Sequence, residues 1–353
     1  MKKILVIMWS RSFVLLSMAL FALAAGCAPV KINTTALVPG RFDQAAQFKK
    51  VAVLPFEGPQ GAEFASEIEG VLASVTINDK PYFEVVDRAS IDKILAEMKL
   101  SMTGLVDPST AAKVGNIVGA RGIYTGAITA STVNDTKYSE KRTRCASEVT
   151  KKDSKGHDYQ DCERWEDYYV PCVKRTATFA FTPKLIEVET GRVLYSNTLE
   201  KRTTSSACVG RKSLADAVEM KRSVQEAVKE SFREDVAPHY VTIQISLMDS
   251  TSDIDSKEAT QKVKSGLDFA KHNRLDRGCA LWTEAKTLSP KSVTILYNLG
   301  VCAEVESRLD DAQSLYKEAD RLMMKPDDRV TIALARISEA IQKRKKLNLQ
   351  VAQ

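Results

Sequence analysis

The sequence contains few of the residues from which enzymes build catalytic and metal sites. Only three histidines occur, each in a different region of the 353-residue chain: His157, His239 and His272. No nucleophile elbow, Cys-His pairing, H-E-x-x-H zinc motif or catalytic pair of carboxylates is present. Gly115, Gly119 and Gly122 lack the order of a phosphate-binding loop. These absences argue against an enzyme and predict no cofactor.

Long apolar runs are also missing after the N-terminal segment, so no transmembrane helix is predicted in the body of the chain. The excess of positive charge is small as well. Without the three basic residues of segment 1–26, the formal net charge falls from +6 to +3. An excess of this size indicates neither a nucleic acid nor an anionic membrane surface as the partner.

The N-terminal segment is the exception. Lys2 and Lys3 precede an apolar run over 13–23, which is too short for a comfortable membrane span and is typical of a secretory signal peptide. The run ends in Leu23-Ala24-Ala25-Gly26-Cys27, which resembles a bacterial lipobox, although the usual Leu stands one position early. The alternatives are an ordinary signal peptide with an incidental cysteine and an uncleaved anchor.

The lipobox resemblance implies that signal peptide 1–26 is removed and that Cys27 is acylated (palmitate) as the new N-terminus. Ala28, rather than Asp, follows the cysteine, which by analogy with that class favours the outer membrane. The six remaining cysteines form an even number. In the oxidising periplasm, an even number predicts disulfides.

Hydrophobic periodicity divides the rest of the chain. Residues 27–48 show little periodicity and are predicted to be a tether. From 49 to 247, short strands alternate with amphipathic helices and a hairpin turns at Thr190-Gly191, which predicts an α/β layer domain with a mixed sheet. A linker over 248–258 leads to a purely helical segment, 259–347. The predicted fold class is α+β followed by an all-α domain.

Four segments of the α/β domain carry a family resemblance. They are KKVAVLPF (49–56), FEVVDRASIDKILAEMKLSMTGLVD (83–107), AAKVGNIVGARGIYTGAIT (111–129) and KLIEVETGRVLYS (184–196). In this order, and together with the lipobox, they resemble the CsgG-like family of outer-membrane lipoproteins, which includes curli secretion channels and LpoB-like activators of cell-wall synthesis. The resemblance implies helices on one side of a mixed sheet and no enzymatic activity.

One stretch departs from the curli channels of that family. Those channels carry two long amphipathic membrane hairpins, the first of which would lie in the Cys-bearing insertion 132–176. Here the insertion is dense in charged residues, and each Lys or Arg at the membrane midplane costs about 2–4 kcal/mol. The second position, around 196–212, is short and polar. The sequence therefore argues against a curli-type pore.

The strand register predicts one disulfide. If Thr190-Gly191 is a two-residue turn, Cys172 and Cys208 lie one residue from direct opposition. A bulge or a longer loop removes such an offset. We therefore expect a Cys172–Cys208 disulfide, which leaves Cys145 and Cys162 to pair within the insertion.

Two features of the insertion have alternative interpretations. A zinc site would combine His157 with Cys145, Cys162 and Cys172, but these cysteines lack the close spacing typical of zinc ligands, and no metal is predicted. The aromatic residues of the insertion either form an exposed contact surface or pack beneath it. They are Tyr159, Trp165, Tyr168 and Tyr169.

The helical segment repeats at an interval of 34 residues. The aligned pairs are Gly266 with Gly300, Gly278 with Ala312, Trp282 with Tyr316 and Ala285 with Ala319. The pattern resembles the tetratricopeptide (TPR) repeat, in which small residues let paired helices approach and a large aromatic fills the gap. Repeat one covers 259–292, repeat two covers 293–326, and a capping helix extends to about residue 347.

The repeats contain three further candidate residues. Cys279 and Cys302 fall on helices that are expected to pack together, which predicts either a disulfide or two buried thiols. Asn298 falls at the concave position where such modules often bond the backbone of a ligand, and it is the predicted partner-binding residue. The alternative is that the repeats only pack against the first domain.

Together these features predict an outer-membrane lipoprotein on the periplasmic face that acts as an assembly or adaptor protein for an envelope complex. Its expected partners are the outer membrane, through the lipid on Cys27, periplasmic or envelope proteins, and further copies of the chain. Nucleic acid is not expected. The alternative function is that of an oligomeric curli-type secretion channel component.

Overall fold

The computed structural model describes residues 29–97, 107–210 and 213–351, so the predicted signal peptide and Cys27 lie outside the described residues. The chain forms two compact units. The sheet unit comprises Val38–His239 and the C-terminal residues from Lys346, and the helical unit comprises the described residues up to Leu37 and Tyr240–Lys345. None of the described helices combines the length and the apolar character that crossing a bilayer requires.

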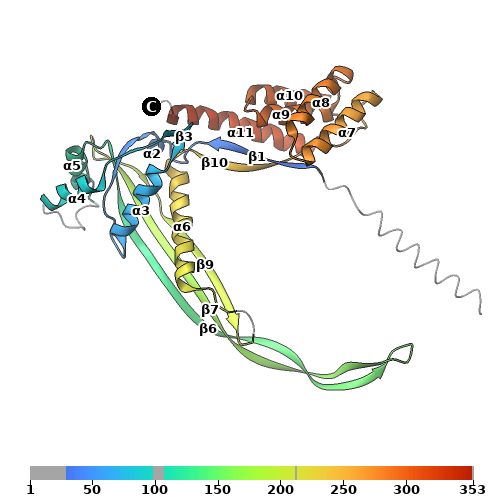
Figure 1. Cartoon of the computed structure of the whole chain (residues 1–353), viewed down its shortest axis with the longest axis horizontal. Helices are drawn as coiled ribbons and strands as arrows, with labels where there is room; N and C mark the ends of the chain where they lie inside the picture. The colour runs from blue at the N-terminus through green and yellow to red at the C-terminus, as the bar shows by residue number, and fades with distance from the viewer. Residues whose placement is uncertain (1–28, 98–106, 211–212, 352–353) are drawn as a thin grey trace, which may run out of the picture. The chain divides into compact units, whose positions relative to one another are not determined.

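A mixed sheet forms the centre of the sheet unit (Figure 1). Its strands are β2 (Lys50–Val53), β5 (Glu84–Val85), β6 (Gly122–Lys152), β7 (Asp158–Glu187), β8 (Val193–Ser196) and β9 (Leu199–Cys208). The strand order is β5-β2-β6-β7-β8, and β9 pairs with β7 farther along that strand. Strand β2 is parallel to β5 and β6, whereas β7 is antiparallel to its three partners. A separate two-stranded sheet joins β3 (Thr76–Ile77) to β4 (Lys80–Pro81).

Helices cover both faces of the mixed sheet, because neighbouring residues of a strand point to opposite sides. Tyr124 contacts Phe232 of α6 (Ala217–Val236), in an aromatic core that α3 (Gly61–Ala73) completes with Phe64. Ile123 lies in the opposite core, formed with α4 (Arg88–Glu97) and α5 (Pro108–Val118). The expectation of helices on one side only is therefore wrong, since α4 and α5 bury an apolar stripe of their own.

Local sequence signals set the ends of these helices. Asp107 accepts a hydrogen bond from the backbone N–H of Thr110 at 3.0 Å and caps α5. Gly119 ends the same helix with a φ of 71°, a conformation that glycine adopts at little cost. Asp216 caps α6 by accepting from two backbone N–H groups of its first turn.

Strands β6 and β7 form one continuous antiparallel hairpin, from the pair Gly122 and Glu187 to the pair Lys152 and Asp158. Figure 1 shows the hairpin projecting past the end of β9 and the start of α6. The expected insertion 132–176 is therefore no separate module, because it consists of the outer parts of these two strands. Polar side chains on both of its faces suit a two-stranded ribbon in water.

The helical unit contains two helix pairs and a long final helix. They are α7 (Lys257–Lys271), α8 (Leu275–Leu288), α9 (Val293–Val305), α10 (Leu309–Leu322) and α11 (Asp328–Val351). Equivalent contacts recur in the two pairs: the ring of Trp282 lies against Gly266, and the ring of Tyr316 lies against Gly300. A side chain on either glycine would overlap the ring. The 34-residue interval therefore corresponds to a repeated packing contact.

The predicted tether over 27–48 is wrong for its described part. Residues 31–38 form strand β1 (Lys31–Val38), which pairs with β10 (His239–Ser246), and 43–47 form helix α2 (Asp43–Gln47). Ile32 is buried in the core of the helical unit. The β-branched residues of β1 favour an extended strand, and the Pro and Gly that follow them obscured this signal.

The boundary expected near residue 247 also differs. From Tyr240 onward, β10 belongs with β1 to the helical unit rather than to the mixed sheet. The segment predicted as a linker, 248–258, contributes the buried side chains of Met248 and Ile254 to the helical core. Because these two side chains are buried in that core, the segment packs as part of the helical unit.

The C-terminal end of α11 is fixed within the sheet unit by the buried side chain of Gln350. Its Oε1 accepts from the N–H of Gly40 at 2.9 Å, and its Nε2 donates to the carbonyl of Gly40 at 3.1 Å and to Asp43 at 3.0 Å. The Lys49 amine donates to the carbonyl of Gln350 at 2.6 Å and lies over the ring of Tyr82. Burial lowers the pKa of Lys49 from its ordinary value of 10.5 to about 7.

This pKa predicts a pH dependence of stability. Because an unfolded lysine still binds a proton above pH 7, stability should rise with pH between about 7 and 10, by about 2 kcal/mol after allowance for partial exposure. Lys49→Met should remove this rise in urea unfolding followed by circular dichroism. Lys50→Met, at the neighbouring exposed position, is the matched control and should keep it. Equal pH profiles for wild type and Lys49→Met would contradict the assignment.

Candidate interaction sites

The first candidate site is the outer part of the β6–β7 hairpin, which begins where β9 ends. Cys172 lies directly opposite Cys208, and the two form a disulfide. Next to the turn, Ile186 pairs with Val193, so the connecting loop is longer than the expected two residues Thr190-Gly191. A register shift between Leu185 and Ile186 then gives the register that Cys172 and Cys208 share. The predicted Cys172–Cys208 pairing is thus confirmed. Beyond it, β6 and β7 continue as a two-stranded ribbon.

A second disulfide, Cys145–Cys162, joins the two strands of this ribbon, as expected from the remaining cysteines. Isolated two-stranded hairpins are marginally stable in water, so a covalent link compensates for the missing neighbouring strands. The zinc alternative fails on this geometry: its cysteines are disulfide-bonded, and His157 lies in the terminal turn, where its backbone N–H donates to Asp153 at 2.9 Å.

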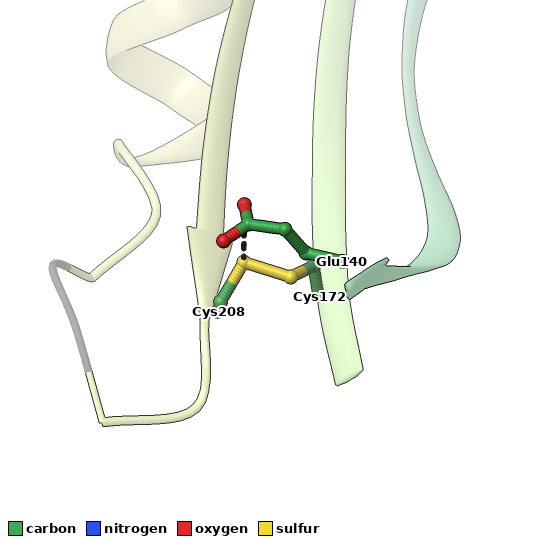
Figure 2. Close-up of side chains that lie close together, drawn as sticks. All are labelled: Glu140, Cys172 and Cys208. Atoms are coloured by element: carbon green, nitrogen blue, oxygen red, sulfur yellow. Dashed lines mark hydrogen bonds between the residues drawn. A yellow bond between two sulfur atoms is a disulfide. The ribbon is translucent and has the colours of Figure 1, made fainter. Parts of the chain in front are cut away.

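One group in the described part of the chain brings three potential metal ligands within 4.8 Å of one another: Glu140, Cys172 and Cys208 (Figure 2). A metal would need thiolates here, because the thiolate is the form of cysteine that binds metal. Both sulfurs are instead joined to each other, and the Glu140 carboxylate lies 3.7 Å from Cys208 Sγ. Glu140 also accepts from Arg142 at 2.7 Å. The arrangement is therefore a disulfide beside the ion pair of Glu140 and Arg142.

Ion pairs line both faces of the ribbon. Lys141 pairs with Asp167 at 2.7 Å on one face, and Arg144 pairs with Glu166 at 2.6 Å on the other. Nearer the core, the guanidinium of Arg175 bonds both oxygens of Asp135 at 2.8 Å and lowers the pKa of that carboxyl. Such exposed pairs add little stability each, and they keep both faces hydrated.

Three of the four aromatic residues singled out in the sequence are exposed and do not pack beneath the ribbon, whereas Tyr168 is half-buried with the Arg144 guanidinium over its ring. Trp165 is 65% and Tyr169 is 69% exposed, and Tyr159 is exposed as well. Alternation along β7 places Trp165 and Tyr169 on the same side of the strand as Val173 and Phe179, the side that helices cover nearer the core. We call Trp165 and Tyr169 the aromatic face.

A shallow depression of about 680 Å³ lies beside the Cys172–Cys208 disulfide, where the ribbon leaves the sheet. Its lining includes Lys137, Pro171, Val173, Val209 and Leu214. Val209 alone is 68% exposed, although apolar side chains of this size are usually buried. The sequence analysis did not include Val209, whose only signal was its position next to the half-cystine Cys208.

The second candidate site surrounds Asn298 on α9, and here the structure contradicts the prediction. Asn298 is fully buried, at 0% exposure. Its Oδ1 accepts from the backbone N–H of Met248 at 2.9 Å, and its Nδ2 donates to the Met248 carbonyl at 2.8 Å. The hydroxyl of the neighbouring Tyr297 donates to the Ser246 carbonyl at 2.9 Å. Asn298 does bind a peptide backbone, but that backbone belongs to its own chain.

Cys279 and Cys302 form the third disulfide, between α8 and α9. The sequence left either a disulfide or two buried thiols for this pair, and the structure contains the disulfide. This bond joins the two repeats covalently close to Asn298. The disulfide restrains α9 against α8 and leaves neither cysteine as a reactive thiol.

The fold defines the class of the protein: a two-unit α+β protein with a mixed sheet and a projecting hairpin. Residues 66–262 match the family described as curli production assembly/transport component CsgG. The match spans more than half of the chain, and the chain therefore belongs to the CsgG family. No curated protein matches the chain significantly.

Solved structures show a distant likeness in fold. The LpoB C-terminal domain from Salmonella enterica shares 14% identity over 44% of this chain and 84% of its own, with a TM-score of 0.25. A PelC dodecamer from Paraburkholderia phytofirmans shares 13% over 58% and 99%, with a TM-score of 0.25. Lipoprotein GNA1162 from Neisseria meningitidis shares 13% over 52% and 96%, with a TM-score of 0.26. Values this low identify no shared activity.

The two hairpin disulfides should have separable effects. Replacing Cys145 and Cys162 by Ser should expose the ribbon to trypsin at Lys141 and Arg144 without loosening the core, because only the ribbon is tied by that bond. Replacing Cys172 and Cys208 should lower the free energy of unfolding by about 3 kcal/mol, since that bond closes a loop across β7, β8 and β9. Limited proteolysis and urea unfolding measure the two effects. Identical behaviour of the two double variants would contradict the assignment of one disulfide to the ribbon and the other to the stability of the core.

Proposed function

We propose that the protein is a lipoprotein of the outer membrane that acts as an assembly or adaptor protein for an envelope complex. In this proposal Cys27 carries the lipid and holds the chain at the periplasmic face of the membrane. The observation that carries the proposal is the disulfide-stapled ribbon with its exposed aromatic face. Membership of the CsgG family supports an envelope-assembly role.

The aromatic face fits a protein partner for physical reasons. Trp and Tyr are enriched at the energetic centres of protein interfaces, because they bury large apolar area with little loss of side-chain freedom. The charged pairs around them suit a polar rim. Two disulfides fix the ribbon before binding, which reduces the ordering cost of association. We take a periplasmic or envelope protein, or a second copy of the chain, as the partner.

The helical unit is proposed to be a TPR-type module that supplies a second binding surface. The recurrence of the Gly266–Trp282 contact as Gly300–Tyr316 supports this assignment. Two helix pairs and a final helix bury a continuous core, which is the usual architecture of a short helical repeat.

A secretion-channel component remains the second candidate function, and the length of the β6–β7 hairpin is what favours it. The charged pairs on both faces of the ribbon disfavour contact with lipid tails. Liposomes that contain the purified lipidated protein should therefore conduct no ions. Ion-conducting rings would overturn the adaptor proposal.

Photo-crosslinking in intact envelopes tests the adaptor proposal directly. A photoreactive phenylalanine analogue at Trp165 or Tyr169 should crosslink to an envelope protein or to a second copy. The same analogue at Tyr240, which is 62% exposed in the helical unit, is the matched control and should crosslink several-fold less.

A Cys27→Ser background should lose both the membrane address and these crosslinks. Equal crosslinking at residues 165, 169 and 240 would contradict a specific contact at the aromatic face. The size of the crosslinked product separates a second copy from another protein.

A further inference from the structure

Two shallow depressions lie on the side of the mixed sheet that α6 covers. The first is the depression beside the Cys172–Cys208 disulfide, which Leu214 lines just before the start of α6. The second, of about 390 Å³, adjoins the first turns of that helix. Val133 of β6 lines the second depression and Lys137 lines the first, so alternation along the strand places both on one side, about 13 Å apart. The two depressions therefore belong to one surface of the sheet unit.

Each depression combines an exposed apolar side chain with positive charge. Val209 lines the first together with Lys137, and Val218, which is 66% exposed, lines the second. Val218 shares one stripe of α6 with Lys221 and Arg222, because residues three and four positions apart on a helix are neighbours. We call these five residues the ribbon-base surface. Exposed apolar side chains bordered by polar ones are typical of a protein interaction site.

The cations of the ribbon-base surface lack acidic partners. Within the described residues, Lys137 and Arg222 form no hydrogen bond or ion pair, and Lys221 donates only to the side-chain amide of the residue before α3, at 2.6 Å. The other two basic residues of α6, Lys229 and Arg233, both pair with glutamates of their own helix. Within α6, the cations left for an external carboxylate are therefore those at the second depression.

We propose that the ribbon-base surface binds a peptide segment of an envelope protein that carries both apolar side chains and carboxylates. The inference rests on the proposed adaptor function and specifies the chemistry of the partner. Apolar side chains of the segment fill the depressions beside the two valines, and its carboxylates meet the free cations. Val173 lines the first depression on the same side of β7 as Tyr169, so the ribbon-base surface continues into the aromatic face.

An anionic membrane surface fits the ribbon-base surface less well than a peptide does. Asp216 and Glu219 are exposed in the first turn of α6, on either side of Val218 along the chain. A broad layer of lipid phosphates would be repelled by these carboxylates while it approached the cations. A narrow peptide segment can contact Lys137, Lys221 and Arg222 without covering the carboxylates. The distribution of charge therefore favours a peptide.

Photo-crosslinking in intact envelopes, followed by mass spectrometry of the linked product, tests this inference. A photoreactive amino acid at Val218 or Val209 should link to a peptide of another envelope protein that contains acidic and apolar residues. Ile117 of α5, which is 56% exposed on the opposite side of the sheet, is the matched control position and should give several-fold less product. A lipid adduct, a link to a second copy of this chain, a linked peptide without acidic residues, or a yield equal to that at Ile117 overturns the inference.

A pair of charge variants tests the role of the free cations. Lys137→Gln with Arg222→Gln should lower the crosslinking yield at Val218 at least about fivefold, because two charge-assisted contacts are lost. Lys113→Gln with Lys174→Gln removes the same charge from exposed lysines on the opposite side of the sheet and should leave the yield unchanged. Circular dichroism shows that both variants are folded. Equal yields in the two double variants overturn the inference.

Crosslinking at the aromatic face, measured in parallel, separates this inference from the adaptor proposal. If Trp165 and Tyr169 crosslink to an envelope protein while Val209 and Val218 do not, the inference fails and the adaptor proposal stands. If all four positions give no more product than their control positions, both fail.

Discussion

The antiparallel ladder between β6 and β7 is the constraint on which the sheet unit depends. At its inner end, this ladder places Ile123 and Tyr124 on opposite faces, so that each face has a core for its own pair of helices. At its outer end, the same alternation carries Trp165 and Tyr169 beyond the last covering helix into solvent. A slip of one residue would exchange the two faces along the whole hairpin. The register therefore fixes the core and the exposed aromatic face together.

Covalent links secure that register where hydrogen bonds from neighbouring strands end. Cys172–Cys208 closes the three-stranded part, and Cys145–Cys162 closes the ribbon. In the helical unit, side chains fix the chain in a similar way: Asn298 bonds the backbone of Met248, and Tyr297 bonds the carbonyl of Ser246 at the end of β10. The envelope role proposed for the chain depends on the first of these results, a rigid ribbon with an exposed aromatic face.

Much of this was predictable from local signals. Capping by Asp107, the 34-residue repeat and the Cys172–Cys208 pairing depend on spacing along the chain, which the sequence displays directly. The errors concern partners that are distant in sequence. Strand β1 pairs with β10 about two hundred residues later, and no local pattern in 31–38 specifies that partner. Asn298 was predicted to bind a partner, and only the tertiary structure shows that it is buried and bonds the backbone of Met248 in its own unit.

The central claim is that one antiparallel ladder between β6 and β7, interrupted only by local bulges, joins the core of the sheet unit to the ribbon that bears the aromatic face. Mass spectrometry of non-reduced tryptic peptides, from mature protein purified from envelopes, tests it most directly. Basic residues separate the four hairpin cysteines, so each pairing gives distinct linked peptides. The account predicts links between Cys145 and Cys162 and between Cys172 and Cys208. Any exchange of partners among these four cysteines would contradict the register and, with it, the exposed aromatic face.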